Sequence, residues 1–234
     1  MYLKLIACNV LLREVCLCAA DSPHTLDIEF TEKGSHDDSE NLRRILQEKI
    51  RQSEDSGKKY DAILLAFGLC GNSTAGLTSA LFPLVIPRAH DCCTLFLGSK
   101  TRFHELFGEN PSLPFSSPGY MERGDSYLQE SEFGAKLGID KTYDEYVALY
   151  GEENARYIME TLEPATKYDG NKLVFIEIPQ TAQPLLKAKA GEQAEKDGKV
   201  FDFVPGDIRL VRNLLHGDWN EEDFCIIGPG QIVT

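Results

Sequence analysis

The sequence predicts an α/β protein that is doubly wound, with mainly parallel sheets in two pseudo-repeated β-α-β-α-β halves. Short apolar runs that suit buried parallel strands alternate with stretches whose apolar residues recur at helical spacing. A weak internal repeat supports the division into halves: helical residues 42–50 precede the apolar run 60–71, and helical residues 208–215 precede the apolar run 221–231. Both runs contain a glycine turn, and 234 residues suffice for two such halves.

The first half, residues 1–108, is expected to consist of alternating strands and helices. Its predicted strands are the apolar run 3–8, the alternating stretch 24–34, the run 60–71 and the run 82–91. Its predicted helices are 9–20, the amphipathic stretch 38–55 with its acidic start, and 92–109. This order is typical of a parallel sheet with crossover helices.

Residues 109–170 differ in composition and are predicted to be an insertion. Residues 110–127 are rich in proline, serine and glycine and lack a clear period, so we expect an irregular loop over 109–142 that serves as a lid or a contact surface. A long helix is expected at 142–167. In the second half, residues 171–234, the predicted strands are 172–178, 201–204 and 223–230, and the predicted helices are 184–198 and 207–217.

The charge of the chain argues against nucleic acid and anionic membranes as partners. The sequence has 37 acidic and 24 basic side chains, a formal net charge of −13, whereas both of those partners favour clustered Lys and Arg. The apolar N-terminal stretch is interrupted by Arg13 and Glu14, unlike a signal peptide. No other segment approaches the run of about 18 uncharged apolar residues that a membrane span requires. We therefore expect a cytoplasmic protein with no membrane partner.

Three of the seven cysteines lie at predicted strand ends. An odd number of cysteines in a cytosolic chain favours reduced thiols or metal ligands over a disulfide framework. Cys8 ends the first strand, Cys70 lies in the glycine turn after the third, and Cys92 follows the fourth. Parallel α/β sheets bind ligands at the carboxyl ends of their strands. A flavodoxin-like strand order, 2-1-3-4, would therefore bring the three thiols to one site.

The other four cysteines are predicted to be small core residues. Cys16, Cys18 and Cys225 lie inside helical or strand patterns, and Cys93 is flanked by apolar residues.

Polar residues beside the strand ends complete the candidate site. The candidate catalytic residues are Arg88, His90 and Asp91, and the candidates for substrate binding are Asn9, Gly71 and Asn72. The glycine turns 68–76 and 228–231 suit anion binding through backbone N–H groups. Neither turn has the glycine spacing of a Walker or Rossmann motif, so no nucleotide fold is predicted.

Metal binding is the first of three chemistries that could use these thiols. Zinc or a [4Fe-4S] cluster requires three or four thiolate or imidazole ligands. Cys8, Cys70 and Cys92 are the predicted metal ligands, with a fourth position left for His90, water or substrate. Arg88 would balance the excess negative charge of three thiolates.

Two other chemistries remain open. Two cysteines on opposite sides of a substrate could act as acid and base on a carbon acid, and the segments ACN (7–9) and GLCGN (68–72) resemble the two-cysteine pattern of the aspartate/glutamate racemase superfamily. Such a pair requires a substrate-sized gap between the sulfurs. A nucleophilic cysteine with His90 as base and Asp91 as its orienter ranks last, because adjacent His and Asp side chains on a loop are poorly placed to pair.

Four segments resemble one protein family. At ACNVLLRE, LLAFGLCGNSTAGL, IPRAHDCCTLFLGS and GDWNEEDFCIIGPGQ the sequence is similar to the domain-of-unknown-function 1638 family of bacterial and archaeal proteins. These segments contain Cys8, Cys70, Arg88, His90 and Cys92. The resemblance implies an association with corrinoid-dependent methyltransferase systems for methylamines, and so a context in one-carbon metabolism, without implying a reaction.

We therefore expect a metal- or iron–sulfur-dependent enzyme or accessory of one-carbon metabolism, with a small-molecule substrate and a corrinoid protein or methyltransferase as partner. The alternatives are a metal-free racemase- or isomerase-like enzyme and a non-catalytic binding partner of a corrinoid methyltransferase. An enzyme should have a closed pocket with a free coordination position. An accessory should expose an apolar patch around Pro114, Phe115 and Tyr120.

Overall fold

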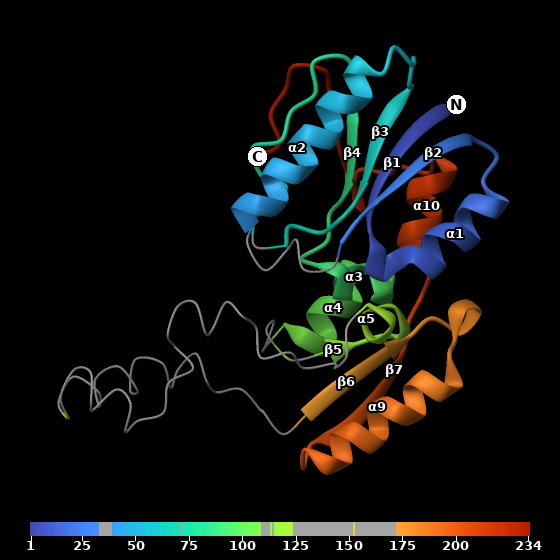
Figure 1. Ribbon diagram of the computed structural model, residues 1–234, viewed down its shortest axis with the longest axis vertical. Helices are drawn as coiled ribbons and strands as arrows, with labels where there is room; N and C mark the ends of the chain where they lie inside the picture. The colour runs from blue at the N-terminus through green and yellow to red at the C-terminus, as the bar shows by residue number, and fades with distance from the viewer. Residues whose placement is uncertain (33–38, 71, 109–112, 114, 124–151, 153–171) are drawn as a thin grey trace.

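The computed structural model contains two sheets with helices between and around them (Figure 1). It describes residues 1–32, 39–70, 72–108, 113, 115–123, 152 and 172–234. The larger sheet has five strands in the order β2-β1-β3-β4-β8, and the smaller has three in the order β5-β6-β7. The predicted doubly wound α/β fold is confirmed. We refer to the parts built on the two sheets as the larger-sheet lobe and the smaller-sheet lobe.

Four strands of the larger sheet are parallel, in the flavodoxin-like order expected from the sequence. They are β1 (Tyr2–Cys8), β2 (Thr25–Thr31), β3 (Ala62–Ala66) and β4 (Leu84–Pro87). Every residue of β3 is buried, as expected for a central parallel strand whose two faces are both covered by helices.

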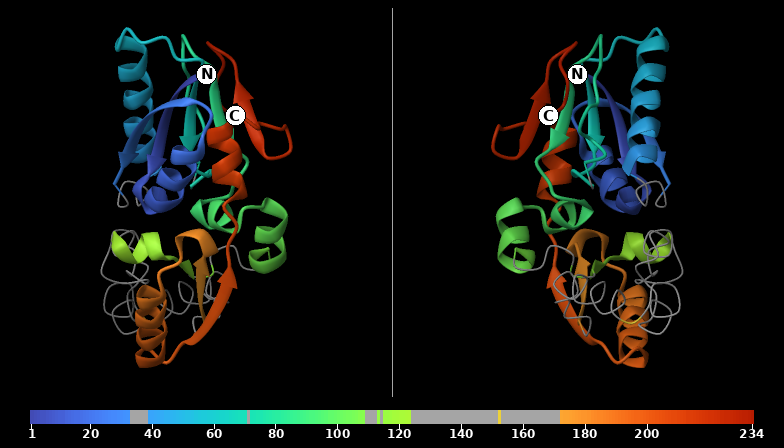
Figure 2. Two further views of the ribbon diagram at one scale, coloured as in Figure 1. Left: turned by 90° about the vertical axis from the view of Figure 1, so that its right-hand side faces the viewer. Right: turned by 90° about the vertical axis from the view of Figure 1, so that its left-hand side faces the viewer.

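Helices cover both faces of this sheet (Figures 1 and 2). Helix α2 (Ser39–Asp55) lies on one side and buries Leu42, Leu46 and Ile50, a stripe spaced four residues apart. Helices α1 (Leu12–Asp21) and α10 (Arg209–His216) lie together on the other side. None of the helices in the described part of the chain is long and apolar enough to cross a membrane.

The end of the chain returns to the larger sheet. Strand β8 (Phe224–Ile227) pairs with β4 and is antiparallel to it. The predicted second half, 171–234, therefore divides between the lobes: β6, β7 and α9 belong to the smaller sheet, whereas α10 and β8 complete the larger one.

The smaller sheet is parallel. Its strands are β5 (Phe115–Ser116), β6 (Lys172–Glu177) and β7 (Val200–Pro205). Helix α9 (Pro184–Lys196) packs against this sheet, and the single-turn helix α5 (Pro118–Glu122) follows β5. Between β6 and α9 the chain forms the 3₁₀ turn η3 (Pro179–Thr181).

The predicted helix 92–109 is wrong, because the structure has two helices there. Helix α3 (Cys92–Leu97) ends at Gly98, whose φ of 71° is left-handed, and α4 (Lys100–Phe107) begins after Ser99, whose hydroxyl accepts from the Arg102 N–H. A Cβ on Gly98 would lie 2.6 Å from the carbonyl oxygen of Asp207, so the close approach of another segment also requires glycine.

The predicted insertion is only partly within the described residues. The segment 110–127, predicted to be an irregular loop, contains strand β5 and helix α5 in its described part, so the absence of a hydrophobic period did not mean absence of structure there. The predicted helix 142–167 lies outside the described residues, apart from residue 152.

Candidate functional site

Three thiols meet where β1, β3 and β4 end. Cys8 is the last residue of β1, Cys70 lies in the turn after β3, and Cys92 is the first residue of α3. The Cys92 thiol is in hydrogen-bonding contact with the thiols of both Cys70 and Cys8. Cys8 and Cys92 are buried, whereas Cys70 is half-buried. None of the three forms a disulfide within the part of the chain that the structure describes.

The turns after β3 and β4 pack directly on each other, which brings Cys70 to Cys92. The Leu69 N–H donates to the carbonyl of Ala89 at 2.8 Å, and the Cys70 N–H donates to the carbonyl of His90 at 3.0 Å. A Cβ on Gly68 would lie 2.6 Å from the Asp91 Cα, so only glycine permits this approach. Gly68, the first residue of the "GLCGN" segment, thus allows the two turns to approach this closely.

The backbone at Cys70 is left-handed, with a φ of 42°. Asn72 also has a left-handed φ, 66°, which asparagine tolerates better than most residues. For a cysteine this conformation costs about 1–2 kcal/mol, and residues held in such regions cluster at functional sites. The conformation that puts the Cys70 thiol beside Cys92 therefore lowers the local stability of the turn.

The contacts between the thiols determine the protonation of Cys92. Hydrogen bonds to the thiols of Cys70 and Cys8, followed by burial, raise the pKa of Cys92 well above its ordinary value. A thiolate at Cys92 would repel negative charge on either neighbour, so without a cation Cys92 holds its proton.

Tyr120 belongs to the same site and was not predicted as a site residue. Burial raises the pKa of its phenol well above the ordinary value, and negative charge at Cys92, Cys8 and Cys70 raises it further. The phenol therefore lies close to the thiols and remains protonated. Tyr120 is on α5, so the site contains groups from both lobes.

Close packing of α5 on the 3₁₀ turn η1 (Asn9–Leu11), directly after Cys8, places Tyr120. A Cβ on Gly119 would lie 1.7 Å from the carbonyl oxygen of Val10, so a side chain cannot be accommodated at this position. The Ser117 hydroxyl accepts from the Tyr120 N–H at 3.4 Å and caps the helix. The signal in the sequence is "SSPGY": a capping serine, a proline suited to the first turn, and a glycine.

The donor set of the thiol cluster suits a soft cation, although the side chains are not arranged around one. Three cysteines in contact are the ligand type of zinc and iron–sulfur sites. Among the residues that the structure describes, however, no three His, Cys, Asp or Glu side chains are positioned to hold a metal ion. The contact of Cys92 with both Cys70 and Cys8 therefore brings the three ligands together without forming a metal site in the present arrangement of the side chains.

The predicted catalytic residues His90 and Asp91 interact with each other. His90 Nδ1 lies 3.1 Å from Asp91 Oδ2, so the expectation that the adjacent side chains pair poorly is wrong. The half-exposed His90 ring stacks on Phe103 with 5.0 Å between ring centroids. Asp91 also caps α3, since its Oδ1 accepts from the Thr94 N–H at 3.4 Å. The contacts of His90 are therefore with Asp91, Thr94 and Phe103, at the start of α3 and in α4, rather than with the thiols.

Arg88 contacts the segment that leads into β8. Its Nε donates to the carbonyl of Glu221 at 2.9 Å and to that of Phe224 at 3.2 Å. These bonds join β4 to its antiparallel neighbour. The expected role of balancing thiolate charge finds no support in the contacts of Arg88.

The predicted substrate-binding residues differ in position. The Oδ1 atom of Asn9, directly after Cys8, is buried with no hydrogen-bond partner in the described part of the chain. Asn72 is exposed, and its carbonyl accepts from Arg43 Nη2 at 2.8 Å. Gly71 lies outside the described residues. Of the two that the structure describes, Asn9 is the one with a buried, unpartnered side-chain atom, and it directly follows Cys8.

Phe115 and Tyr120, expected in an exposed apolar patch, are both half-buried. Both rings pack against the main hydrophobic core, 5.2 Å apart between centroids, and Tyr120 also lies 6.3 Å from Phe96. Pro114 lies outside the described residues.

Comparison with known proteins identifies a family but no named activity. The family described as "Protein of unknown function (DUF1638)" matches residues 30–215. No curated protein and no solved structure matches the chain.

Proposed function

From the premise that the chain belongs to the DUF1638 family, we propose that it is a metal-thiolate or iron–sulfur protein whose ligands are Cys8, Cys70 and Cys92. The observation that supports the proposal is the contact of the Cys92 thiol with both other thiols, at the strand ends where α/β proteins bind ligands. Zinc and a [4Fe-4S] cluster both fit this donor set.

The physical reason is electrostatic. Thiolates held together repel each other, and contact with the two other thiols, together with burial, raises the pKa of Cys92, so without a cation the Cys92 thiol stays protonated and unreactive. A soft cation reverses both effects, because thiolates are its preferred ligands and their charge is then compensated. The strained backbone at Cys70 is consistent with a turn kept for ligand placement rather than stability.

The residues around the thiols would orient a substrate. A bound zinc ion would supply Lewis-acid chemistry, and a cluster would supply electron transfer. The protonated Tyr120 hydroxyl would donate a hydrogen bond to a substrate oxygen. The unpartnered Asn9 Oδ1 would accept one from a substrate N–H or O–H.

Direct contact between the thiols favours metal binding over the two-cysteine acid–base mechanism. That mechanism needs room for a substrate between the sulfurs of Cys8 and Cys70, whereas the thiol of Cys92 is in contact with both of them. We further propose that the site works in one-carbon metabolism with a corrinoid protein or methyltransferase, the context implied by the family resemblance.

Metal analysis of protein purified without air or chelator tests the proposal. We expect about one equivalent of zinc, or about four of iron with a visible absorption band, in the wild-type protein. Cys70→Ser and Cys92→Ser should each lose most of the metal. The matched control is Cys225→Ser, since Cys225 is a half-buried cysteine of β8 outside the cluster, and it should keep the wild-type metal content.

Less than about a tenth of an equivalent of metal in the wild-type protein, after incubation with zinc or with iron and sulfide, would end the metal proposal. Equal metal content in all three variants would end the assignment of the ligands.

A further inference from the structure

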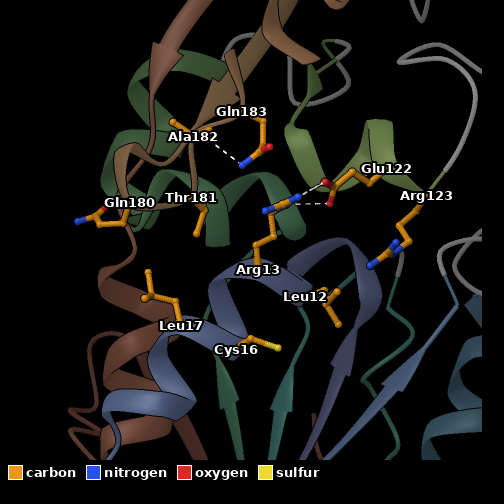
Figure 3. Close-up of a pocket in the computed structure, with 10 residues that line it drawn as sticks. All are labelled: Leu12, Arg13, Cys16, Leu17, Glu122, Arg123, Gln180, Thr181, Ala182 and Gln183. Atoms are coloured by element: carbon orange, nitrogen blue, oxygen red, sulfur yellow. Dashed lines mark hydrogen bonds and ion pairs between the residues drawn. The ribbon is translucent and has the colours of Figure 1, made fainter. Parts of the chain in front are cut away.

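A second candidate site lies between the two lobes, on the outer side of α1 (Figure 3). It is a pocket of about 740 Å³, within the range of small-molecule sites. Its walls come from α1, from the end of α5 and the residue after it, and from the segment around η3. Both lobes therefore contribute to it.

The pocket has an apolar floor and a polar opposite wall. Leu12, Cys16 and Leu17 of α1 form the floor. The Gln183 side chain points toward Arg13 from the other lobe, and its Nε2 donates to the Ala182 carbonyl at 2.8 Å, which leaves its Oε1 without a partner in the described chain. Such a wall suits a ligand with one hydrocarbon side and one polar side.

Two guanidinium groups and one carboxylate define the charge of the pocket. Arg13 Nε lies 2.9 Å and 3.0 Å from the two oxygens of Glu122, and Arg13 Nη2 also pairs with this carboxylate. This pair joins α1 to α5 and leaves Arg13 Nη1 outside the pair. Hydrogen bonding to Glu122 raises the pKa of Arg13. The pair is therefore neutral as a whole.

Arg123 makes the pocket positive. Its side chain forms no ion pair or hydrogen bond with the part of the chain that the structure describes, and Figure 3 shows it reaching back toward Leu12. The chain as a whole carries a formal charge of −13, so a guanidinium in a pocket with no ion pair among the described residues is an exception to its general charge. Guanidinium groups bind carboxylates and phosphates through paired N–H donors.

We propose that this pocket binds a small anion, a molecule with a carboxylate or phosphate group and an apolar part. The anionic group would pair with Arg123 and with Arg13 Nη1, which lies outside the pair with Glu122, and the apolar part would lie on Leu12, Cys16 and Leu17. A ligand bound in this way bridges the lobes beside the Arg13–Glu122 pair. The proposal is independent of the thiol cluster, which shares no residue with the pocket.

Alkylation of Cys16 reports occupancy directly, because this thiol is exposed and lines the pocket. The full chain is treated with iodoacetamide in the presence of increasing phenyl phosphate, and the labelling rate at Cys16 is followed by mass spectrometry. We expect a saturable decrease of at least about fivefold, whereas labelling of Cys225 should not change. Phenylacetate tests the carboxylate class in parallel, and benzyl alcohol is the neutral control.

Arg123→Gln should raise the half-protecting concentration of phenyl phosphate about tenfold, the effect of losing one charge-assisted pair. The matched control is Arg51→Gln, which removes the same charge from an exposed position of α2 and should leave protection unchanged. Protection by either anion supports the proposal and identifies the anionic group.

Three results would overturn the proposal: no protection by either anion in the wild-type protein, equal protection by benzyl alcohol, or an unchanged half-protecting concentration in a folded Arg123→Gln. Protection of Cys16 in the wild-type protein by the anions, compared with protection by benzyl alcohol, tests the proposal even if Arg123→Gln does not fold. Metal content, measured on the same samples, shows the state of the thiol cluster separately.

Discussion

At the scale of single residues, the three thiols lie where they do because of the strands that precede them, whereas Tyr120 and His90 are positioned by contacts between distant segments or neighbouring helices. Cys8, Cys70 and Cys92 could be placed because each follows an apolar run, and parallel strands end at one edge of a sheet. Tyr120 could not, since its position depends on contacts between distant segments. His90 could be placed on the correct turn, but stacking on Phe103 directs its ring to the surface of α3 and α4.

Cys70 offers a test of whether the strained turn is kept for the thiol. Because glycine has no Cβ, Cys70→Gly should relieve the left-handed backbone, whereas Cys70→Ala retains the strain. We expect the free energy of unfolding of Cys70→Gly to exceed that of Cys70→Ala by about 1 kcal/mol, as measured by urea denaturation. Both variants should lose metal. Equal stability of the two would mean that the backbone at this position is not strained.

At the scale of elements, α5 is the part of the site that a hydrophobic pattern could not predict. A single-turn helix is too short to show a 3.6-residue period, so its segment looks like a loop in the sequence. The contact of Gly119 with the Val10 carbonyl holds it in place, and Tyr120 follows directly. The strand and helix signals of β1, β3 and α2 are stronger because those elements are longer or completely buried.

Gly119→Ala should separate α5 from η1. Its Cβ would overlap the backbone carbonyl of Val10, and backbone cannot move aside as a flexible side chain can. We expect a loss of about 1–3 kcal/mol in the free energy of unfolding, measured by urea denaturation, and weaker metal binding.

The matched control for this change is Gly191→Ala. A Cβ on Gly191, inside α9, would lie 3.9 Å from the Phe201 ring, an ordinary contact. Because alanine favours helices, this variant should be as stable as the wild type or more stable by up to about 1 kcal/mol. If both variants behaved alike, the close packing of α5 on η1 would not be what positions Tyr120.

At the scale of the whole molecule, the larger sheet is completed from both ends of the sequence. The apolar run within 223–230 predicted a strand but could not give its partner or direction, because an apolar strand suits either lobe. The pairing follows from long-range contacts: Arg88 bonds to carbonyls before and in β8, and Arg209 pairs with Asp223 at 2.6 Å. The sequence therefore predicted a strand at β8 but not its position at the edge of the larger sheet.

A chain that ends at Pro205 should not fold. The deletion removes six large side chains that are almost fully buried: Ile208, Leu210, Val211, Leu214, Leu215 and Phe224. Each contributes about 1.5–3 kcal/mol by burial, and the sum approaches or exceeds the total stability of about 5–15 kcal/mol that is typical of a domain. Circular dichroism during heating should show no cooperative transition, whereas deletion of the exposed Thr234 alone should leave the transition unchanged. A cooperative transition in the shortened chain would contradict this prediction.

The antiparallel pairing of β8 with β4 also bears on the order of events during synthesis. All four residues of the thiol site, Cys8, Cys70, Cys92 and Tyr120, are made within the first 120 positions, long before the strand that flanks β4. While the ribosome still holds the C-terminal segment, β4 has a free edge, and the turn that carries Cys92 lacks the neighbour that fixes Arg88. The surroundings of the thiol site are therefore complete only after residues 224–227 have emerged and paired with β4, so a metal ion would meet the finished site only after that step.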